Sequence, residues 1–268
     1  MEVIRQGPLF IDAHIHLADP DYEHRVERVL EIARKENVVA LVANSMNLKT
    51  SGVSVRLAIS NPALVYAAVG IHPWNAQRVE FDEFGGIEVL VRQKRNQILA
   101  IGEIGLDKSY AKTPENFAEQ RRFFEKQLSL AEETNLPVIV HSRSCSREVL
   151  DTLSSYNSKR VLMHWYSGPL EYVKEMCDKG WMLSFGPSIF YSKTIREIMS
   201  KIPVVSLLTE TDGPVAYRGP FEGRETTPEF IRLVVEEIAR ILNSDHQTVA
   251  DQILENFYRF FGVRRELG

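Results

Sequence analysis

Short apolar segments alternate with helical segments along almost the whole chain. Eight apolar segments recur, and several, such as 38–43, are continuous β-branched-rich runs typical of parallel strands buried on both faces. The segments expected to form strands are 10–17, 38–43, 65–72, 98–102, 138–141, 161–164, 181–185 and 204–211. Repeated strand–helix units predict an α/β fold with a parallel sheet, and eight units in 268 residues predict a (β/α)8 TIM barrel.

Apolar residues at helical spacing occupy the segments between these strands. The expected helices are 25–37, 53–59, 81–95, 114–134, 147–153, 170–179, 193–201, 228–242 and 248–261. Thr227 is the candidate N-cap of the helix 228–242. No linker or change of composition divides the chain, so we expect a single domain over residues 1–268. An open doubly wound sheet is the alternative, but no glycine-rich phosphate loop follows any strand.

Polar side chains that bind metals stand where most of these strands end. His14 and His16 share one face of the first strand, because successive strand residues point to opposite faces. Later strands lead into His72, Glu103, His141, His164 and Asp212. The carboxyl ends of barrel strands meet at one mouth, where barrel enzymes hold their active sites. The pattern therefore predicts a metal site at this mouth rather than isolated, exposed histidines.

Four of these imidazoles and two carboxylates are more than one tetrahedral ion needs. They suit two divalent metal ions (Mg, Mn or Zn) a few ångströms apart, with Glu103 as the bridge because it enters from the strand between the two histidine groups. The assigned ligands are His14, His16 and Asp212 for one ion, and His141 and His164 for the other. A metal-activated hydroxide would be the nucleophile, and Asp212 would orient it or take its proton. Asp212 and Glu103 are therefore the expected catalytic residues.

The overall charge argues against a protein that coats nucleic acid. The net charge is −4 and the pI is about 6.0, whereas a general polyanion-binding surface needs an excess of Lys and Arg. Cys145 and Cys177 form no close-spaced motif, so we expect buried thiols rather than a disulfide or a zinc site. No signal peptide is visible, and the longest apolar runs fall far short of the ~20 residues that span a bilayer. We therefore expect a soluble cytoplasmic protein without membrane contact.

Six short motifs occur in an order that characterises one known family. They are His-x-His at 14–16, Gly-Ile-His-Pro at 70–73, Gly-Glu-Ile-Gly-Leu-Asp at 102–107, Pro-Val-Ile-Val-His-Ser at 137–142, His-Trp-Tyr-Ser-Gly at 164–168 and Thr-Glu-Thr-Asp at 209–212. Over about residues 9–262 the chain resembles the TatD family of metal-dependent hydrolases, the TatD-type DNases, which belong to the amidohydrolase-like barrels. It departs from the family pattern at Trp165 and Tyr166, where the family usually has Cys and Phe.

The resemblance implies a two-metal site on the same six residues. It also implies hydrolysis of DNA phosphodiester bonds, typically by a Mg²⁺- or Mn²⁺-dependent exonuclease. In this family the residue at His72 lines the pocket without binding metal. We therefore expect His72 to contact a substrate phosphate or the leaving group, as a catalytic and substrate-binding residue; a strand-end histidine that only packs is the alternative.

Three arginines near the predicted mouth are candidates for binding substrate phosphates. Arg143 closely follows the fifth-strand histidine, and Arg218 and Arg224 lie after the last strand, a common phosphate-binding place in barrels. A solvated surface arginine is the alternative. Trp74 and Trp165 could stack on a base or sugar, although large aromatic residues at a barrel rim as often only pack.

Two further carboxylates share a strand face with a predicted ligand. Glu210 stands two residues before the last predicted ligand, and Asp12 two residues before His14. We expect each to hold a ligand histidine from behind, or else to form an ion pair inside the barrel. His24 and His246 fall outside the strand ends and are expected at the surface.

Three classes of function are compatible with these features. The first is a two-metal phosphodiesterase acting on DNA or a small phosphoester, with no obligate protein partner. The second is hydrolysis of a small amide, lactone or ester, or deamination, as in other amidohydrolase-type barrels, which often use a carbamylated lysine where this chain has Glu103. A non-catalytic metal-binding role is the third, and the complete set of six ligands disfavours it.

Overall fold

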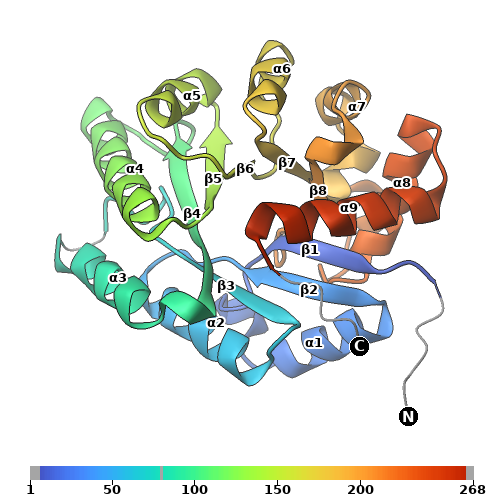
Figure 1. Cartoon of the computed structure of the whole chain (residues 1–268), viewed down its shortest axis with the longest axis horizontal. Helices are drawn as coiled ribbons and strands as arrows, with labels where there is room; N and C mark the ends of the chain where they lie inside the picture. Colours follow the sequence, from blue (N-terminus) through green and yellow to red (C-terminus); the bar gives the residue numbers. More distant parts are fainter. Residues whose placement is uncertain (1–6, 79–80, 264–268) are drawn as a thin grey trace.

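The computed structural model describes residues 7–78 and 81–263. In these ranges eight parallel strands form one sheet, and each strand pairs with the next one in the sequence. The strands are β1 (Phe10–Ile15), β2 (Val38–Ala43), β3 (Val65–Val69), β4 (Ile98–Asp107), β5 (Val138–Arg143), β6 (Val161–Met163), β7 (Met182–Phe185) and β8 (Leu207–Thr209). The helices lie around the outside of the strands (Figure 1). The predicted TIM-barrel architecture is therefore confirmed.

Hydrogen bonds near the strand ends hold β8 against β1. The Thr209 hydroxyl donates to the Ile11 carbonyl at 2.7 Å, which joins positions 198 residues apart. The Asp212 N–H donates to the His14 carbonyl at 2.8 Å. These contacts nearly close the sheet into a barrel, so the residues at the ends of β1 and β8 face the same mouth.

Nearly every strand is followed by a helix that covers the outside of the sheet. The helices are α1 (Val26–Lys35), α2 (Leu48–Ser60), α3 (Phe81–Gln93), α4 (Pro114–Thr134), α5 (Ser146–Ser154), α6 (Glu171–Asp178), α7 (Lys193–Met199), α8 (Phe230–Leu242) and α9 (His246–Phe261). α2 starts earlier than predicted because Asn47 and Thr50 form a capping box, in which the Asn47 side chain accepts the Thr50 N–H. Thr113 caps α4, which has the predicted bounds.

The hydrophobic core fills the barrel and the layer between strands and helices. Every residue of β1, β6, β7 and β8 is buried. On α8 the buried residues include Ile231, Val234, Val235 and Ile238, which recur at helical spacing. Full burial of one such side chain contributes roughly 1.5–3 kcal/mol. These apolar strands leave their carboxyl ends as the place where polar side chains meet.

The last strand is shorter than the sequence predicts. Residues 204–206 form a 3-10 turn instead of extended strand, and the Pro203 carbonyl accepts the Ser206 N–H at 2.9 Å. Val205 in this turn is 47% exposed, so the apolar run is not buried on both faces as a central strand would be.

The start of α8 and the position of His246 also differ from prediction. The N-cap of α8 is Glu229 and not Thr227. The Thr227 carbonyl accepts the Phe230 N–H and the Pro228 carbonyl accepts the Ile231 N–H, each three residues on, so the α-helix starts only after this 3-10-type turn. His246 begins α9 half-buried, with its ring centroid 5.8 Å from that of Phe10, and is not the predicted surface residue. His24 is exposed as predicted.

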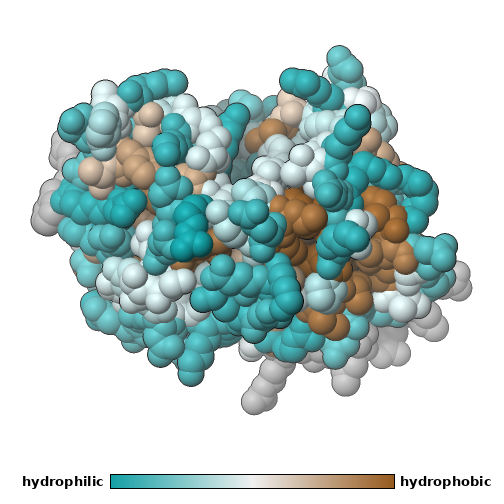
Figure 2. All heavy atoms as spheres, turned by 90° about the horizontal axis from the view of Figure 1, so that it is seen from above, coloured by the Kyte–Doolittle hydropathy of each residue, from teal (hydrophilic) through white to brown (hydrophobic). Residues whose placement is uncertain are grey.

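The surface seen in Figure 2 is mainly hydrophilic, with a smaller hydrophobic area. Among the described residues, the exposed large apolar side chains are Ile59, Val89, Tyr191, Val205 and Val215. Cys145 is a buried free thiol and Cys177 a half-buried one. Of the helices in the described ranges, none combines the length and hydropathy needed to cross a bilayer.

Candidate metal centre

Residues from β1, β4 and the end of β8 meet at one point inside the mouth. Glu103 Oε2 lies 3.2 Å from His14 Nε2 and 3.3 Å from His16 Nε2. Asp212 Oδ1 lies 3.5 Å and 3.3 Å from the same two nitrogens. The two nitrogens are themselves 3.2 Å apart. The predicted pairing of His14 and His16 on one face is therefore observed, with both carboxylates beside them.

The second oxygen of Glu103 faces a different group of imidazoles. Its Oε1 atom lies 2.9 Å from His141 Nδ1, 3.3 Å from His164 Nε2 and 3.2 Å from His72 Nε2. The structure thus brings together all seven polar residues predicted at the strand ends. The five histidines among them contact one or the other oxygen of the buried Glu103 carboxylate.

A glycine allows β4 and β5 to approach closely enough to build this cluster. Gly105 pairs with His141 in the sheet and has a positive φ of 131°. A Cβ atom at Gly105 would lie 2.1 Å from the His141 carbonyl oxygen. Only glycine fits there, so this residue of the 102–107 motif sets the spacing between Glu103 and His141.

Contacts behind three of the histidines set the direction of their rings. Glu210 Oε2 lies 3.0 Å from His164 Nδ1, so Glu210 holds a cluster histidine from behind as predicted. His16 Nδ1 lies 3.3 Å from the Asn44 carbonyl oxygen. His72 Nδ1 accepts the backbone N–H of Trp74 at 3.1 Å, which leaves Nε2 as the nitrogen that carries the proton in the neutral ring.

Asp12 does not hold the His14 ring, and that prediction is wrong. Its Oδ1 accepts the backbone N–H of His14 at 3.2 Å and that of Thr211 at 3.0 Å, while Oδ2 accepts the Thr211 hydroxyl at 2.5 Å. His14 Nδ1 is buried and has no hydrogen-bond partner within the described residues. Burial raises the pKa of Asp12 to about 7. Asp12 therefore ties β1 to the segment after β8.

Sequence reasoning missed Asp107, which contacts the cluster directly. Its Oδ2 atom lies 3.0 Å from His141 Nε2 and accepts the Trp74 indole N–H at 2.6 Å. β4 extends to Asp107, beyond the predicted end at residue 102, so Asp107 lies on the same strand face as Glu103, four residues on. The sequence feature that could have identified Asp107 is its position at the end of the 102–107 motif.

Burial and charge move the imidazole pKa values of the cluster in opposite directions. Burial lowers the pKa of His72 to about 4, so its ring is neutral near pH 7. Burial also opposes protonation of His16, but hydrogen bonds to Asp212 and Glu103 raise its pKa to about 10. Burial acts to raise the pKa of Glu103, yet the imidazoles, those of His72 and His164 foremost, hold it well below its usual value. The carboxylates therefore stabilise positive charge between them.

The donor atoms of the cluster fit divalent cations. Ligand atoms of His14, His16 and Glu103 lie within 4.8 Å of one another, and so do those of His72, Glu103 and His141. Two imidazole nitrogens 3.2 Å apart need a proton or a cation between their lone pairs. Mixed imidazole and carboxylate ligands suit several divalent metals, including Zn²⁺ and Mn²⁺.

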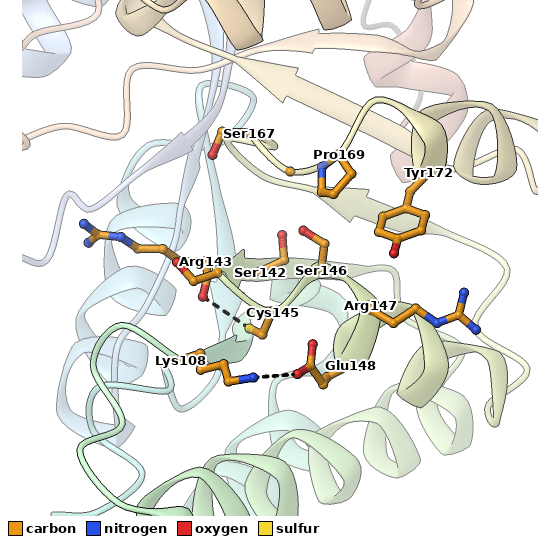
Figure 3. Close-up of a pocket in the computed structure, with 12 residues that line it drawn as sticks. Lys108, Ser142, Arg143, Cys145, Ser146, Arg147, Glu148, Ser167, Pro169 and Tyr172 are labelled. Atoms are coloured by element: carbon orange, nitrogen blue, oxygen red, sulfur yellow. Dashed lines mark hydrogen bonds and ion pairs between the residues drawn. The ribbon is translucent and has the colours of Figure 1, made fainter.

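Arg143 lies beside a cavity next to the mouth. The cavity has a volume of about 460 Å³ and lies between the ends of β4 and β5, the start of α5 and the loop after β6 (Figure 3). Arg143 and Arg147 extend to opposite sides of it. Arg147 pairs with Asp151 at 2.8 Å, whereas no carboxylate of the described ranges pairs with Arg143. Arg143 shares the strand face of His141, which leads toward the metal cluster.

The two arginines after β8 differ in their surroundings. Arg218 is exposed, and none of the described carboxylates pairs with it. Arg224 pairs with Glu229 at 2.8 Å, and its guanidinium lies 4.8 Å from the centroid of the Phe230 ring. These contacts engage Arg224 with the start of α8.

The two tryptophans form separate aromatic contacts at the rim. The Trp74 ring stacks on Tyr110 with centroids 5.5 Å apart and meets the His72 ring edge-on at 4.9 Å. The Trp165 ring lies 5.4 Å from that of Tyr217 and packs in a small apolar cluster beyond β8. The Trp165 ring also meets the His164 ring edge-on at 6.4 Å, so both tryptophans contact cluster histidines and Trp74 lies closer to its neighbour.

Comparison with known proteins agrees with this architecture. Residues 11–262 match the family of TatD-related DNases. The human deoxyribonuclease TATDN3 is 31% identical over 269 residues, which cover 97% of each chain. A protein of Methanocaldococcus jannaschii named as a metal-dependent hydrolase is 32% identical, with 95% of this chain and 98% of that protein covered.

A solved structure shows the same similarity in three dimensions. The crystal structure of YjjV, a TatD homologue from Escherichia coli, superposes with a TM-score of 0.88 at 27% sequence identity, over 95% of this chain and 98% of that one. With the family match and these relatives, the chain belongs to the TatD-related DNase family of metal-dependent hydrolases.

Proposed function

We propose that this protein hydrolyses DNA phosphodiester bonds with two divalent ions, Mg²⁺, Mn²⁺ or Zn²⁺. The observation that carries the proposal is that the two oxygens of the Glu103 carboxylate contact different groups of histidines. One oxygen faces the two histidines of the β1 segment, and the other faces His141 on β5, His164 after β6 and His72 after β3. A carboxylate that offers its oxygens to separate imidazole groups is suited to bridge two cations. The ligands are His14, His16 and Asp212 on one side, His141 and His164 on the other, and Glu103 between them.

Asp212 is proposed to prepare the attacking water. When bound, the ions supply Lewis acidity and lower the pKa of water. Asp212 Oδ1 lies beside the β1 imidazoles, and the Asp212 N–H is bonded to β1, so the carboxylate is held in place. Burial opposes ionisation, but the hydrogen bond with His16 lowers the pKa of Asp212. The ionised carboxylate can then orient the water and accept its proton.

His72 is proposed to donate a hydrogen bond to the substrate. Because Nδ1 accepts the backbone N–H of Trp74, the proton of the neutral ring is on Nε2, which lies 3.2 Å from Glu103 Oε1. Burial lowers the pKa of His72 to about 4, which keeps the ring neutral. In this structure that N–H faces Glu103 Oε1, and once Glu103 binds the ions the N–H would be free to donate to a phosphate oxygen or the leaving group.

DNA is the proposed substrate because two observations agree. The family and the human relative are named as DNases, and Arg143, two residues after His141 on β5, has no carboxylate partner among the described residues. Arg143 and Arg218 are proposed to bind phosphates next to the bond that is cleaved. Arg224 could join them only by exchanging its pairing with Glu229.

The decisive experiment is hydrolysis of labelled single-stranded DNA by metal-stripped protein to which Mg²⁺, Mn²⁺ or Zn²⁺ is returned one at a time. We expect metal-dependent release of nucleotides, and a loss of at least about 100-fold in Asp212→Asn, in line with removal of a general base. Asp178→Asn, an exposed aspartate that pairs with Lys174 on α6, is the matched control and should retain full activity.

Two results would contradict this proposal. Undiminished hydrolysis by Asp212→Asn would show that a contaminating nuclease is responsible. No release with any metal, from protein that still binds two ions, would instead favour the hydrolysis of small amides or lactones.

Arg143→Ala should weaken DNA binding without changing the metal site. A charge-assisted hydrogen bond contributes about 1.5–3 kcal/mol, so KM for single-stranded DNA should rise roughly 10- to 100-fold. Arg147→Ala is the control, since Arg147 extends to the other side of the cavity and pairs with Asp151 (Figure 3). Steady-state kinetics at 0.05 M and 0.2 M salt would measure both variants. Equal KM values for the two variants would show that Arg143 does not bind the substrate.

A further inference from the structure

The Asp107 carboxylate is completely buried and binds three donors that serve different parts of the site. Oδ2 lies 3.0 Å from His141 Nε2 and 2.6 Å from the Trp74 indole nitrogen, and Oδ1 accepts the Tyr110 N–H at 3.0 Å. The Asp107 N–H donates to Gln120 on α4 at 2.8 Å, which anchors the end of β4. The carboxylate therefore has a fixed position and a full set of partners.

The first consequence concerns the proton of His141. Asp107 Oδ2 and Glu103 Oε1 can both only accept, so a cation held between Nδ1 and Glu103 requires the neutral His141 ring to carry its proton on Nε2, toward Asp107. The Nδ1 lone pair then points at the proposed metal position, where Glu103 Oε1 lies 2.9 Å away. A carboxylate behind a ligand imidazole fixes the tautomer and increases the basicity of the nitrogen that binds metal.

The second consequence concerns the aromatic wall beside the cluster. The oxygen that accepts from His141 also holds the Trp74 indole N–H, and the Trp74 ring stacks on Tyr110. The ring lies edge-on to His72 at 4.9 Å and to His141 at 6.4 Å. An indole held rigidly beside the metal ligands is suited to stack on a nucleobase.

We propose that Asp107 is a positioning residue that couples metal binding to substrate binding. Its Oδ2 atom directs His141 Nδ1 toward the metal position and holds Trp74 as a wall of the substrate site. This inference rests on the proposed metal-ligand role of His141 and, for Trp74, on the proposed nucleic acid substrate.

The first test measures metal affinity without substrate. Asp107→Asn keeps the side-chain size but replaces two anionic acceptors by one amide oxygen, so His141 loses its negative partner. Titration of metal-stripped protein with Zn²⁺ against a chelating dye should show affinity reduced about 10- to 100-fold. The matched control Asp178→Asn should match the wild type. Unchanged Zn²⁺ affinity in folded Asp107→Asn would overturn the proposal.

A double variant shows whether Asp107 acts through His141. In a His141→Ala background, Asp107→Asn should cause no further loss of Zn²⁺ affinity, whereas an independent, general destabilisation would add its full effect. If His141→Ala alone leaves Zn²⁺ affinity unchanged, the proposed ligand set has failed. If His141→Ala weakens binding and Asp107→Asn does not, the ligand set stands and the positioning role is wrong.

A measurement on the wild-type protein covers the case in which Asp107→Asn does not fold. Long-range ¹H–¹⁵N NMR spectra of the Zn²⁺-loaded protein should show His141 with its proton on Nε2 and its Nδ1 bound to metal. A proton on Nδ1 would contradict the role of Asp107 directly.

The role proposed for Trp74 is tested by measuring KM and kcat separately for variants at this position. Trp74→Ala should raise KM for single-stranded DNA at least about fivefold, as expected for the loss of one stacked base, with Zn²⁺ affinity unchanged. Trp74→Phe keeps an aromatic ring but removes the indole N–H, so its KM should lie between those of the wild type and Trp74→Ala. If Trp74→Ala leaves KM unchanged, Trp74 is not a wall of the substrate site.

Discussion

Glu103→Gln is expected to lower kcat/KM by at least about 1000-fold, the largest effect of any single substitution. The reason is that one carboxylate faces both imidazole groups, through Oε2 to His14 and His16 and through Oε1 to His141. The substitution removes the charge and turns one of the two acceptors into an NH2 group. Metal ions contribute several kcal/mol of transition-state stabilisation, and each 1.4 kcal/mol is a factor of ten in rate.

The metal content of Glu103→Gln should change with its activity. Wild-type protein should bind two equivalents of Mn²⁺ or Zn²⁺ in equilibrium dialysis, whereas the variant should lose at least one of them. Glu88→Gln, a partly exposed glutamate near Arg92 on α3, is the matched control. A variant that retained two tightly bound ions and near-normal activity would exclude Glu103 as the bridge.

Gly105→Ala is expected to lower the free energy of unfolding by about 3 kcal/mol or more. Alanine at φ 131° is strained, and its Cβ would meet the backbone carbonyl of His141 at 2.1 Å, where no flexible side chain can move away. Backbone strain and overpacking each cost about 1–3 kcal/mol. For a chain of this size the melting temperature of the metal-free protein should fall by about 6–12 °C.

A variant at a second glycine distinguishes backbone strain from the Cβ clash as causes of the lower free energy of unfolding. Gly180 also has a positive φ, of 74°, but a Cβ there would have nothing within 4 Å. Gly180→Ala should therefore show only the cost of the backbone conformation, about 1–2 kcal/mol. If both variants melt at the same temperature, the close approach of β4 and β5 does not depend on Gly105. Refolded Gly105→Ala should also bind metal poorly, because relieving the clash moves His141 away from Glu103.

Residues that act through their position on a strand were predictable from the sequence. The alternation of apolar strands with helices indicated the barrel, and residues that follow buried strands must meet at its mouth. This reasoning located His14, His16, His72, Glu103, His141, His164 and Asp212, and the structure brings them together. It also located Glu210, because residues two apart on a strand share a face.

Tertiary structure alone decided the contacts that depend on how far strands extend and on what packs behind them. Asp107 escaped prediction because β4 continues past residue 102 through pairing with β5, which the local sequence does not specify. Asp12 binds the segment after β8 and not the His14 ring, and Arg224 is engaged by Glu229 and Phe230. A pattern of alternating residues determines which face a side chain takes, because that depends on the backbone of its own strand. The partner that it meets on that face depends on distant segments, and only the folded chain brings these together.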